Sequence, residues 1–185
     1  MNEPNCPPLA AEILAFWRNA GPERWFGKDE AFDRVVKEKF LDAQEHAARR
    51  RFDAWMNSPE GALALIVLLD QFPRNMYRGT PLAFANDGLA REYASEAIRK
   101  GLDRTFENPV RRFFYMPMMH SEALADQDIC IAKCVDAHDA EGVKFAQIHR
   151  DIIARFGRFP HRNAILGRIS SSEEQAFLDA GGFAG

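Results

Sequence analysis

The sequence predicts an all-α fold. Apolar residues recur every three or four positions over most of the chain, which is the period of an amphipathic helix. Ser, Thr, Pro and Gly stand where helices are expected to start and end. No segment alternates apolar and polar residues between hairpin turns, as a half-buried strand would. With 185 residues and no low-complexity linker, residues 1–185 are predicted to form a single helical domain.

The first helices follow from apolar spacing and capping residues. One is predicted over residues 9–20, and residues 28–56 are expected to form one helix or two with a bend. Ser58 can cap a third helix that has Pro59 at its first position and reaches Phe72. This helix is apolar on nearly every side, so it is predicted to be central and buried.

The second half of the chain is also predicted to be helical. One helix is expected over residues 80–100, and a shorter one ends at about Pro117. Another begins at Ser121, and a further one covers residues 141–156. Ser171 with Glu174 forms a capping box for a last helix. The 141–156 helix has a clean apolar face that includes Phe145 and Ile148, which predicts a second central helix. Short turns between consecutive helices predict antiparallel helical hairpins.

One phrase occurs twice, as Phe72-Pro73-Arg74-Asn75 and as Phe159-Pro160-His161-Arg162-Asn163. Each follows an apolar helical segment, and proline ends a helix by steric clash and a missing donor, so both are interpreted as helix-exit turns. Each turn places a fixed cation beside an amide that both donates and accepts hydrogen bonds. The two turns are either a duplicated structural joint or two halves of one polar site. Our hypothesis is that they meet across the domain and that their arginines face a shared polar cleft.

Composition limits the classes of function. The net charge of −3 argues against a nucleic-acid partner. The longest apolar run, residues 62–69, is far shorter than a membrane span, so no membrane partner is expected. Glu3 and the early prolines lack the pattern of a secretory signal, and three cysteines give no disulfide framework, so a cytoplasmic location is expected.

Four longer phrases carry a family resemblance. They are Leu69-Asp70-Gln71-Phe72-Pro73-Arg74-Asn75, Tyr77-Arg78-Gly79-Thr80-Pro81, Tyr115-Met116-Pro117-Met118-Met119-His120-Ser121-Glu122 and Arg155-Phe156-Gly157-Arg158-Phe159-Pro160-His161-Arg162-Asn163. With these phrases the chain resembles a widespread family of small uncharacterised proteins, a domain of unknown function. The resemblance implies an irregular tetratricopeptide-like array of helical hairpins, and it implies no activity.

Histidines and arginines of the C-terminal part are candidate ligand-binding residues. His149 is in step with the apolar face of its helix, so it points inward, where a histidine is either structural or functional. His161 lies on a turn among basic residues that either bind an anion or satisfy helix carbonyls and nearby acids. These basic residues are Arg155, Arg158, Arg162 and Arg168, and Asn163, a further candidate, directly follows Arg162.

A second group of candidates lies near residues 70 and 120. His120 with Glu122 is a candidate acid–base pair, although a carboxylate in a first helical turn needs no function to explain it. Asp70 and Gln71 close the most apolar helix, where a carboxylate opposes the helix dipole. A compensating cation is therefore expected, with Arg74 or Arg78 nearest in sequence.

Cys130, Cys134 and His138 fall four residues apart, as if on one helix. Three successive turns of a straight helix cannot readily surround a tetrahedral ion, and no fourth ligand is evident from the spacing. Neither a metal nor a cofactor is therefore predicted, and the cysteines are expected to pack in the core.

Two hypotheses about function remain open. In the first, the chain is a helical binding module that recognises a peptide or a protein along an open groove. In the second, Arg74, Asn75, His120, His161 and Arg162 surround a polar cleft for an anionic small molecule, with or without catalysis.

Overall fold

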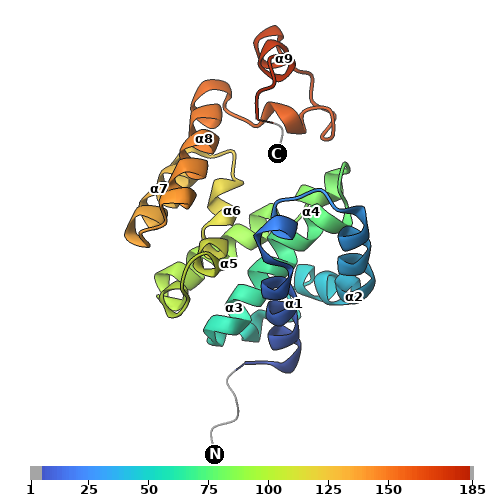
Figure 1. Cartoon of the computed structure of the whole chain (residues 1–185), viewed down its shortest axis with the longest axis vertical. Coiled ribbons are helices and arrows are strands. Elements are labelled where there is room, and N and C mark those ends of the chain that lie inside the picture. The colour runs from blue at the N-terminus through green and yellow to red at the C-terminus, as the bar shows by residue number, and fades with distance from the viewer. Residues whose placement is uncertain (1–5, 184–185) are drawn as a thin grey trace, which may run out of the picture.

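The computed structural model describes residues 6–183, and the chain is helical along most of its path (Figure 1). No strand occurs within these residues, so the all-α prediction is confirmed. Glu3 and its neighbours, on which the argument against a secretory signal depends, lie outside the described residues. Between residues 6 and 183, none of the helices has both the length and the apolar character needed to cross a bilayer.

Two long helices begin the chain. α1 spans Pro8–Trp25 and bends at Gly21, whose φ of 70° favours glycine. α2 spans Glu30–Ala48 and is capped by Asp29, whose carboxylate accepts from two backbone N–H groups at 3.0 Å. A 3₁₀ segment, Asp53–Asn57, follows α2, so residues 28–56 form a helix and a short turn rather than one helix.

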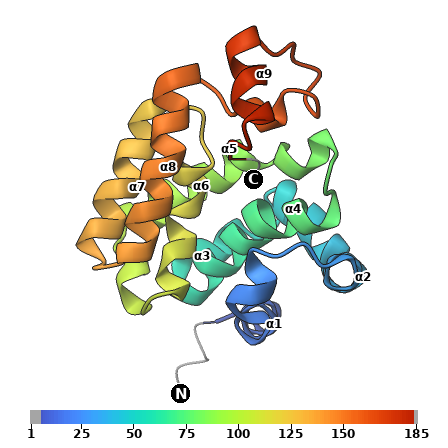
Figure 2. The same cartoon turned by 45° about the horizontal axis from the view of Figure 1, so that its top comes forward.

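α3, Pro59–Ile66, is the centre of the fold. Ser58 caps it as predicted, accepting from the Gly61 N–H at 3.1 Å. Every residue from 61 to 73 is buried, and α3 packs against both α1 and α5 (Asp87–Arg99) (Figure 2). A helix that is apolar on all sides is stable in water only when neighbours cover it, so its central position follows from its composition.

The end of this central helix differs from the prediction. Pro73 does not end it; a π-helical turn, Val67–Gln71, connects α3 directly to α4, Phe72–Met76, with Pro73 in the first turn of α4. The first turn of a helix tolerates proline because its N–H groups have no partner within the helix. At the second phrase the predicted helix end is confirmed, since α8 ends at Phe156 and Gly157 follows with φ of 68°; Pro160 then opens a 3₁₀ turn, Pro160–Arg162.

α7, Leu124–Asp136, and α8, Ala140–Phe156, form an antiparallel hairpin at one side of the molecule (Figures 1 and 2). The prediction that α8 is central is wrong, because the side chains of Phe145 and Ile148 are exposed. The expectation that Cys130, Cys134 and His138 lie on one helix is also wrong. Cys130 and Cys134 are buried within α7, but His138 lies exposed beyond its end, with a φ of 53°.

Three other boundaries differ from the predictions. Residues 80–100 are divided into a 3₁₀ turn, Pro81–Phe84, and α5. Pro117 lies inside α6, Met116–Met119, rather than at a helix end. Ser121 does not open α7, which starts three residues later, but its hydroxyl accepts from the Ala123 N–H at 3.1 Å.

The C-terminal segment forms a small second apolar cluster. Its buried members are Ile152, Ile153 and Phe159, and Phe156, Phe177 and Phe183 pack against them. α9, Ser172–Asp179, begins with the predicted capping box of Ser171 and Glu174, which is confirmed. Polar side chains lie between this cluster and the main core.

Candidate functional site

Seven polar side chains from distant parts of the chain meet where α4, α5, α6 and α8 approach the 160–162 turn. We call them the polar cluster: Asp70, Arg74, Asp87, His120, His149, His161 and Arg162. Figure 2 shows these elements converging below α9. The cluster includes six candidates from the sequence, and Asp87 is its unpredicted member.

Asp70 anchors the cluster from the π-helical turn. Its side chain is fully buried, and it accepts hydrogen bonds from the Gln71 amide and from His120 Nδ1, the latter at 2.8 Å. Arg74 Nη1 lies 3.2 Å from Asp70 Oδ1, so Arg74 is the predicted compensating cation. Burial alone would raise the pKa of Asp70, but Arg74 and His120 hold it at about 2. Asp70 is therefore a carboxylate at neutral pH.

The two repeated phrases meet at Asp87. Arg74 donates to both oxygens of the Asp87 carboxylate at 3.0 Å, a bidentate pair. Arg162 Nη1 lies 3.4 Å from Asp87 Oδ2, which is also bound by Arg74. The hypothesis that the two turns lie together therefore agrees with the geometry.

Arg162 is held in an unusual environment. Its side chain is 8% exposed, and its guanidinium carbon lies 4.7 Å from the ring centre of Phe84 and 4.5 Å from that of Phe159. Its Nε is buried and has no hydrogen-bond partner within residues 6–183. Burial, with repulsion from Arg74, lowers the pKa of Arg162 to about 10, so it stays a cation at neutral pH.

Hydrogen bonds fix the tautomers of two histidines. His149 Nδ1 lies 2.8 Å from the backbone carbonyl of Phe145, which only accepts, so this nitrogen carries the proton. The same reasoning applies to His120, because its Nδ1 faces the Asp70 carboxylate. In the neutral forms, both Nε2 atoms therefore carry a lone pair, and neither forms a hydrogen bond within the described residues.

The three histidines of the cluster are neutral at pH 7. Burial, followed by repulsion from His120, lowers the pKa of His149 to about 4. Burial and Arg162 likewise lower the pKa of His161 to about 4, and burial and Arg74 lower the pKa of His120. Phe183 packs on two of them, with ring centres 4.6 Å from His149 and 5.5 Å from His161. Apolar walls thus disfavour the charged imidazoles.

Two predicted binding residues lie in a separate joint. Asn75 donates to Asp33 at 2.7 Å, and Arg78 forms a bidentate pair with the same carboxylate at 2.7 and 3.0 Å. These contacts attach α4 to the start of α2. Gln71, although it contacts Asp70, donates its amide inside the protein and acts on the cluster through that carboxylate.

The basic residues expected around His161 are paired with acids instead. Arg155 pairs with Glu173 at 2.9 Å and Arg158 with Glu174 at 2.6 Å, which attaches α8 to α9. A second pair, Arg168 with Glu122, is 2.7 Å long. Only Arg162 among these arginines belongs to the polar cluster.

Glu122 is not the partner of His120, so the predicted acid–base pair is wrong. Its oxygens accept from Arg168 and from the Phe159 backbone N–H, at 2.8 Å for the latter. Asn163 is buried, and its side chain bonds Ser170 and Arg168 at 3.1 and 3.0 Å. Both residues therefore hold the 159–170 loop together.

Sequence reasoning missed Asp87 and the π-helical turn. Asp87 stands in the first turn of α5, where an acidic residue is ordinary, so it gave no signal of function. The π-helical turn has no motif of its own in the sequence. The one signal near it is Asp70, an acidic residue inside an apolar helix and shortly before Pro73. π-helical turns often occur at functional sites.

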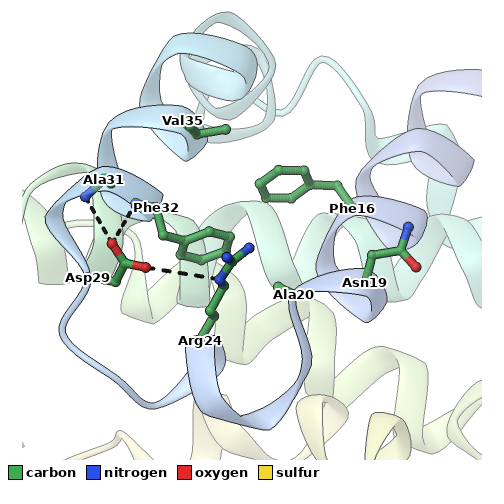
Figure 3. A pocket seen from close by; sticks show the side chains of 8 residues that line it. All are labelled: Phe16, Asn19, Ala20, Arg24, Asp29, Ala31, Phe32 and Val35. Atoms are coloured by element: carbon green, nitrogen blue, oxygen red, sulfur yellow. Dashed lines mark hydrogen bonds and ion pairs between the residues drawn. The ribbon is translucent and has the colours of Figure 1, made fainter.

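Two hollows lie away from the polar cluster. The first, of about 260 Å³, lies between α1 and α2, and Figure 3 shows Phe16, Phe32 and Arg24 among the side chains that line it. Its one carboxylate, Asp29, is engaged as the cap of α2. The second, of about 360 Å³, is lined by charged residues that include Asp103 and Arg111, which pair with each other. Neither contains a histidine.

Comparison with known proteins identifies a family, and the descriptions of its members name no function. Residues 13–182 match the family described as bacterial protein of unknown function (DUF924). A solved structure of a protein of unknown function from Agrobacterium tumefaciens is 47% identical, with a TM-score of 0.90, over 93% of this chain and 97% of that chain. No curated protein shows significant similarity to the chain.

Proposed function

The chain belongs to this bacterial family of unknown function, DUF924, and we propose that it binds a small carboxylate-bearing molecule at the polar cluster. The observation that carries the proposal is the almost completely buried guanidinium of Arg162. Among residues 6–183, its Nε has no hydrogen-bond partner and its one contact to a carboxylate is long, at 3.4 Å. Buried charges normally have close, well-aligned partners. A ligand oxygen would supply the missing partner.

Energetics support the same conclusion. Lowering the pKa of Arg162 from 12.5 to about 10 means that folding disfavours its charged form by about 3 kcal/mol. A carboxylate near Arg162 would recover part of this free energy through a charge-assisted hydrogen bond. The side chains of Arg74 and Asp87 are 21% and 20% exposed, so a ligand would approach the cluster from their side.

The charge balance of the cluster favours a monoanionic ligand over a dianionic one. With the three histidines neutral, the two arginines and the two aspartates of the cluster sum to zero. A phosphate dianion would lie close to Asp70 and Asp87 without a net positive field to hold it. A carboxylate fits the planar guanidinium and adds only one negative charge.

The other predicted function, recognition of a peptide by a helical module, has less support. Such modules use a long groove along successive helices. The two hollows described above are each confined to a few neighbouring segments. We also propose a cytoplasmic location, which the three free cysteines support.

The proposal is tested by titrating the protein with acetate, butyrate and benzoate while the ring resonances of His149 and His161 are followed by NMR. We expect saturable shifts with the unaltered protein and at least a tenfold weaker affinity for Arg162→Gln. Arg155→Gln is the matched control, because Arg155 is exposed and pairs with Glu173. Arg162→Lys, which keeps the charge but not the planar fork, should be intermediate.

Thermal denaturation of each variant distinguishes a ligand-binding role of Arg162 from a purely structural one. Arg162→Gln that is folded and has lost binding supports the proposal. Equal affinity in folded Arg162→Gln, or no saturable shift with any of the three carboxylates, would overturn it.

A further inference from the structure

We propose that the polar cluster is a hydrolytic site in which His120, oriented by Asp70, activates water against the ester bond of a carboxylate-bearing substrate. This inference rests on the proposed carboxylate site at Arg162 and adds a reaction to it. It does not require Glu122, the partner predicted for His120 from the sequence.

The geometry of Asp70 and His120 is that of an oriented general base. The Nδ1–H of His120 donates to Asp70 Oδ1 at 2.8 Å, so the ring is held in one tautomer, and the Nε2 lone pair accepts no hydrogen bond from residues 6–183. Carboxylate and imidazole have the same relation in serine hydrolases, where the carboxylate orients the base and stabilises its protonated form. The side chain of His120 is 12% exposed, so water can reach it.

Asp70 is itself held firmly. It accepts from Gln71 in the same π-helical turn and lies 3.2 Å from Arg74 in α4, and it also accepts from His120, which follows α6. Such turns are rare and frequently occur at functional sites. Here the turn directs a fully buried carboxylate at an imidazole from a residue 50 positions away.

Water is the nucleophile because the cluster has no hydroxyl or thiol among its seven side chains. A proton passes from water to His120 Nε2 as the water oxygen forms a bond to the ester carbonyl carbon. The carbonyl π electrons move onto the carbonyl oxygen, which gives a tetrahedral intermediate, while Arg162 holds the substrate's separate carboxylate. When the intermediate collapses, the carbon–oxygen bond to the alcohol breaks, and that oxygen takes the proton back from His120. The products are an acid and an alcohol.

The charge balance selects a carboxylic ester over a phosphate ester. Its electrophilic carbon is neutral, and only the substrate's separate carboxylate is charged. A phosphate monoester would bring a dianion beside the carboxylate of Asp70. We therefore expect esters of small dicarboxylic acids, in which the free carboxylate is available to a guanidinium.

The test uses mono-4-nitrophenyl succinate as substrate, with 4-nitrophenyl acetate and 4-nitrophenyl phosphate for comparison. Turnover of the succinate ester by the full chain should exceed that of the acetate ester. His120→Asn, which keeps a donor for Asp70 but removes the base, should lower kcat by a factor of about 100 or more. His46→Asn is the control for non-specific imidazole catalysis, because His46 is a surface residue bonded to the Asp42 carbonyl.

The pH profile gives an independent readout. Because the pKa of His120 is lowered, kcat/KM should remain high below the usual titration range of histidine. Asp70→Asn should lower kcat and change this profile, whereas a purely structural role of Asp70 would change stability and leave the profile unaltered.

The outcomes distinguish this inference from the binding proposal. No turnover of the succinate ester above the buffer rate, or equal turnover in folded His120→Asn, overturns the hydrolytic role while carboxylate binding is unaffected. Preferred turnover of the phosphate ester overturns the substrate class. If His120→Asn abolishes turnover and Arg162→Gln does not, the result supports His120 as the general base and overturns the proposed carboxylate site at Arg162.

Discussion

Replacement of Asp139 by alanine should cause the largest loss of stability that we predict for a single residue outside the polar cluster. The Asp139 carboxylate accepts from Arg112 Nε and Nη2 at 2.5 and 2.6 Å, and both side chains are almost completely buried. Asp139 also caps α8, accepting from the Gly142 N–H at 2.9 Å. Alanine would therefore remove a buried ionic partner and a helix cap together.

The magnitude follows from these two roles. Leaving one member of a buried ion pair without its partner costs about 3–5 kcal/mol. Glu141, whose side chain is 66% exposed, still reaches Arg112 at 2.9 Å and offsets part of this cost. Loss of the cap adds about 1 kcal/mol. We expect Asp139→Ala to lower the free energy of unfolding by about 4 kcal/mol, a large share of the 5–15 kcal/mol of an ordinary domain.

Urea denaturation followed by circular dichroism measures the effect, with two variants as internal controls. Asp139→Asn keeps a good cap and loses only the charge, so its loss should be about 1 kcal/mol smaller than that of alanine. Glu141→Gln should cost less than about 1 kcal/mol, because exposed ion pairs contribute little. The reasoning is refuted if Asp139→Ala and Glu141→Gln lower stability equally at unchanged m-value.

Two further predictions concern other buried carboxylates. The pKa of Asp70 is about 2 in the folded state against 3.8 when unfolded, so as the pH falls from 4 to 2 the unfolded chain takes up the proton first and stability falls. Over that interval, the free energy of unfolding of Asp70→Asn should fall by about 2 kcal/mol less than that of the unaltered protein. Parallel pH–stability curves would contradict this. Tyr115→Phe should cost about 1–3 kcal/mol in urea, because the hydroxyl donates to buried Asp103 at 2.7 Å and accepts from Arg111. Thr105→Val, at an exposed hydroxyl, should cost less than about 0.5 kcal/mol, and an equal loss in both variants would exclude the buried network as the cause.

The sequence was most informative where structure depends on near neighbours. The Ser58 cap and the Ser171–Glu174 capping box form as predicted, because each joins residues only three positions apart. The burial of α3 was also predictable, since a helix without a polar face has no stable exposed position. α8 shows the limit of this reasoning: the period of an apolar face identifies the face, but not whether another element covers Phe145 and Ile148.

The candidate site was predictable in composition but not in pairing. Arginine, asparagine and histidine in the repeated phrases indicated where polar chemistry is concentrated. Four of the candidates nevertheless bond within structural joints: Asn75, Arg155, Arg158 and Asn163. Three others belong to the polar cluster: Arg74, His120 and Arg162. Local sequence does not distinguish these cases, because an arginine beside a helix end has several acids within reach of its long side chain.

The sequence by itself determined the all-α class, the buried central helix and the capped helix starts, because these depend on the helical period and on residues within one turn. Tertiary structure alone decided the polar cluster. Asp70 meets His120 across 50 positions, and Arg162 meets Asp87 across 75. Such pairs exist only once α4, α5 and α6 pack together and the chain returns after α8. The desolvation that lowers the pKa of His149 and His161 is likewise a property of the packed molecule.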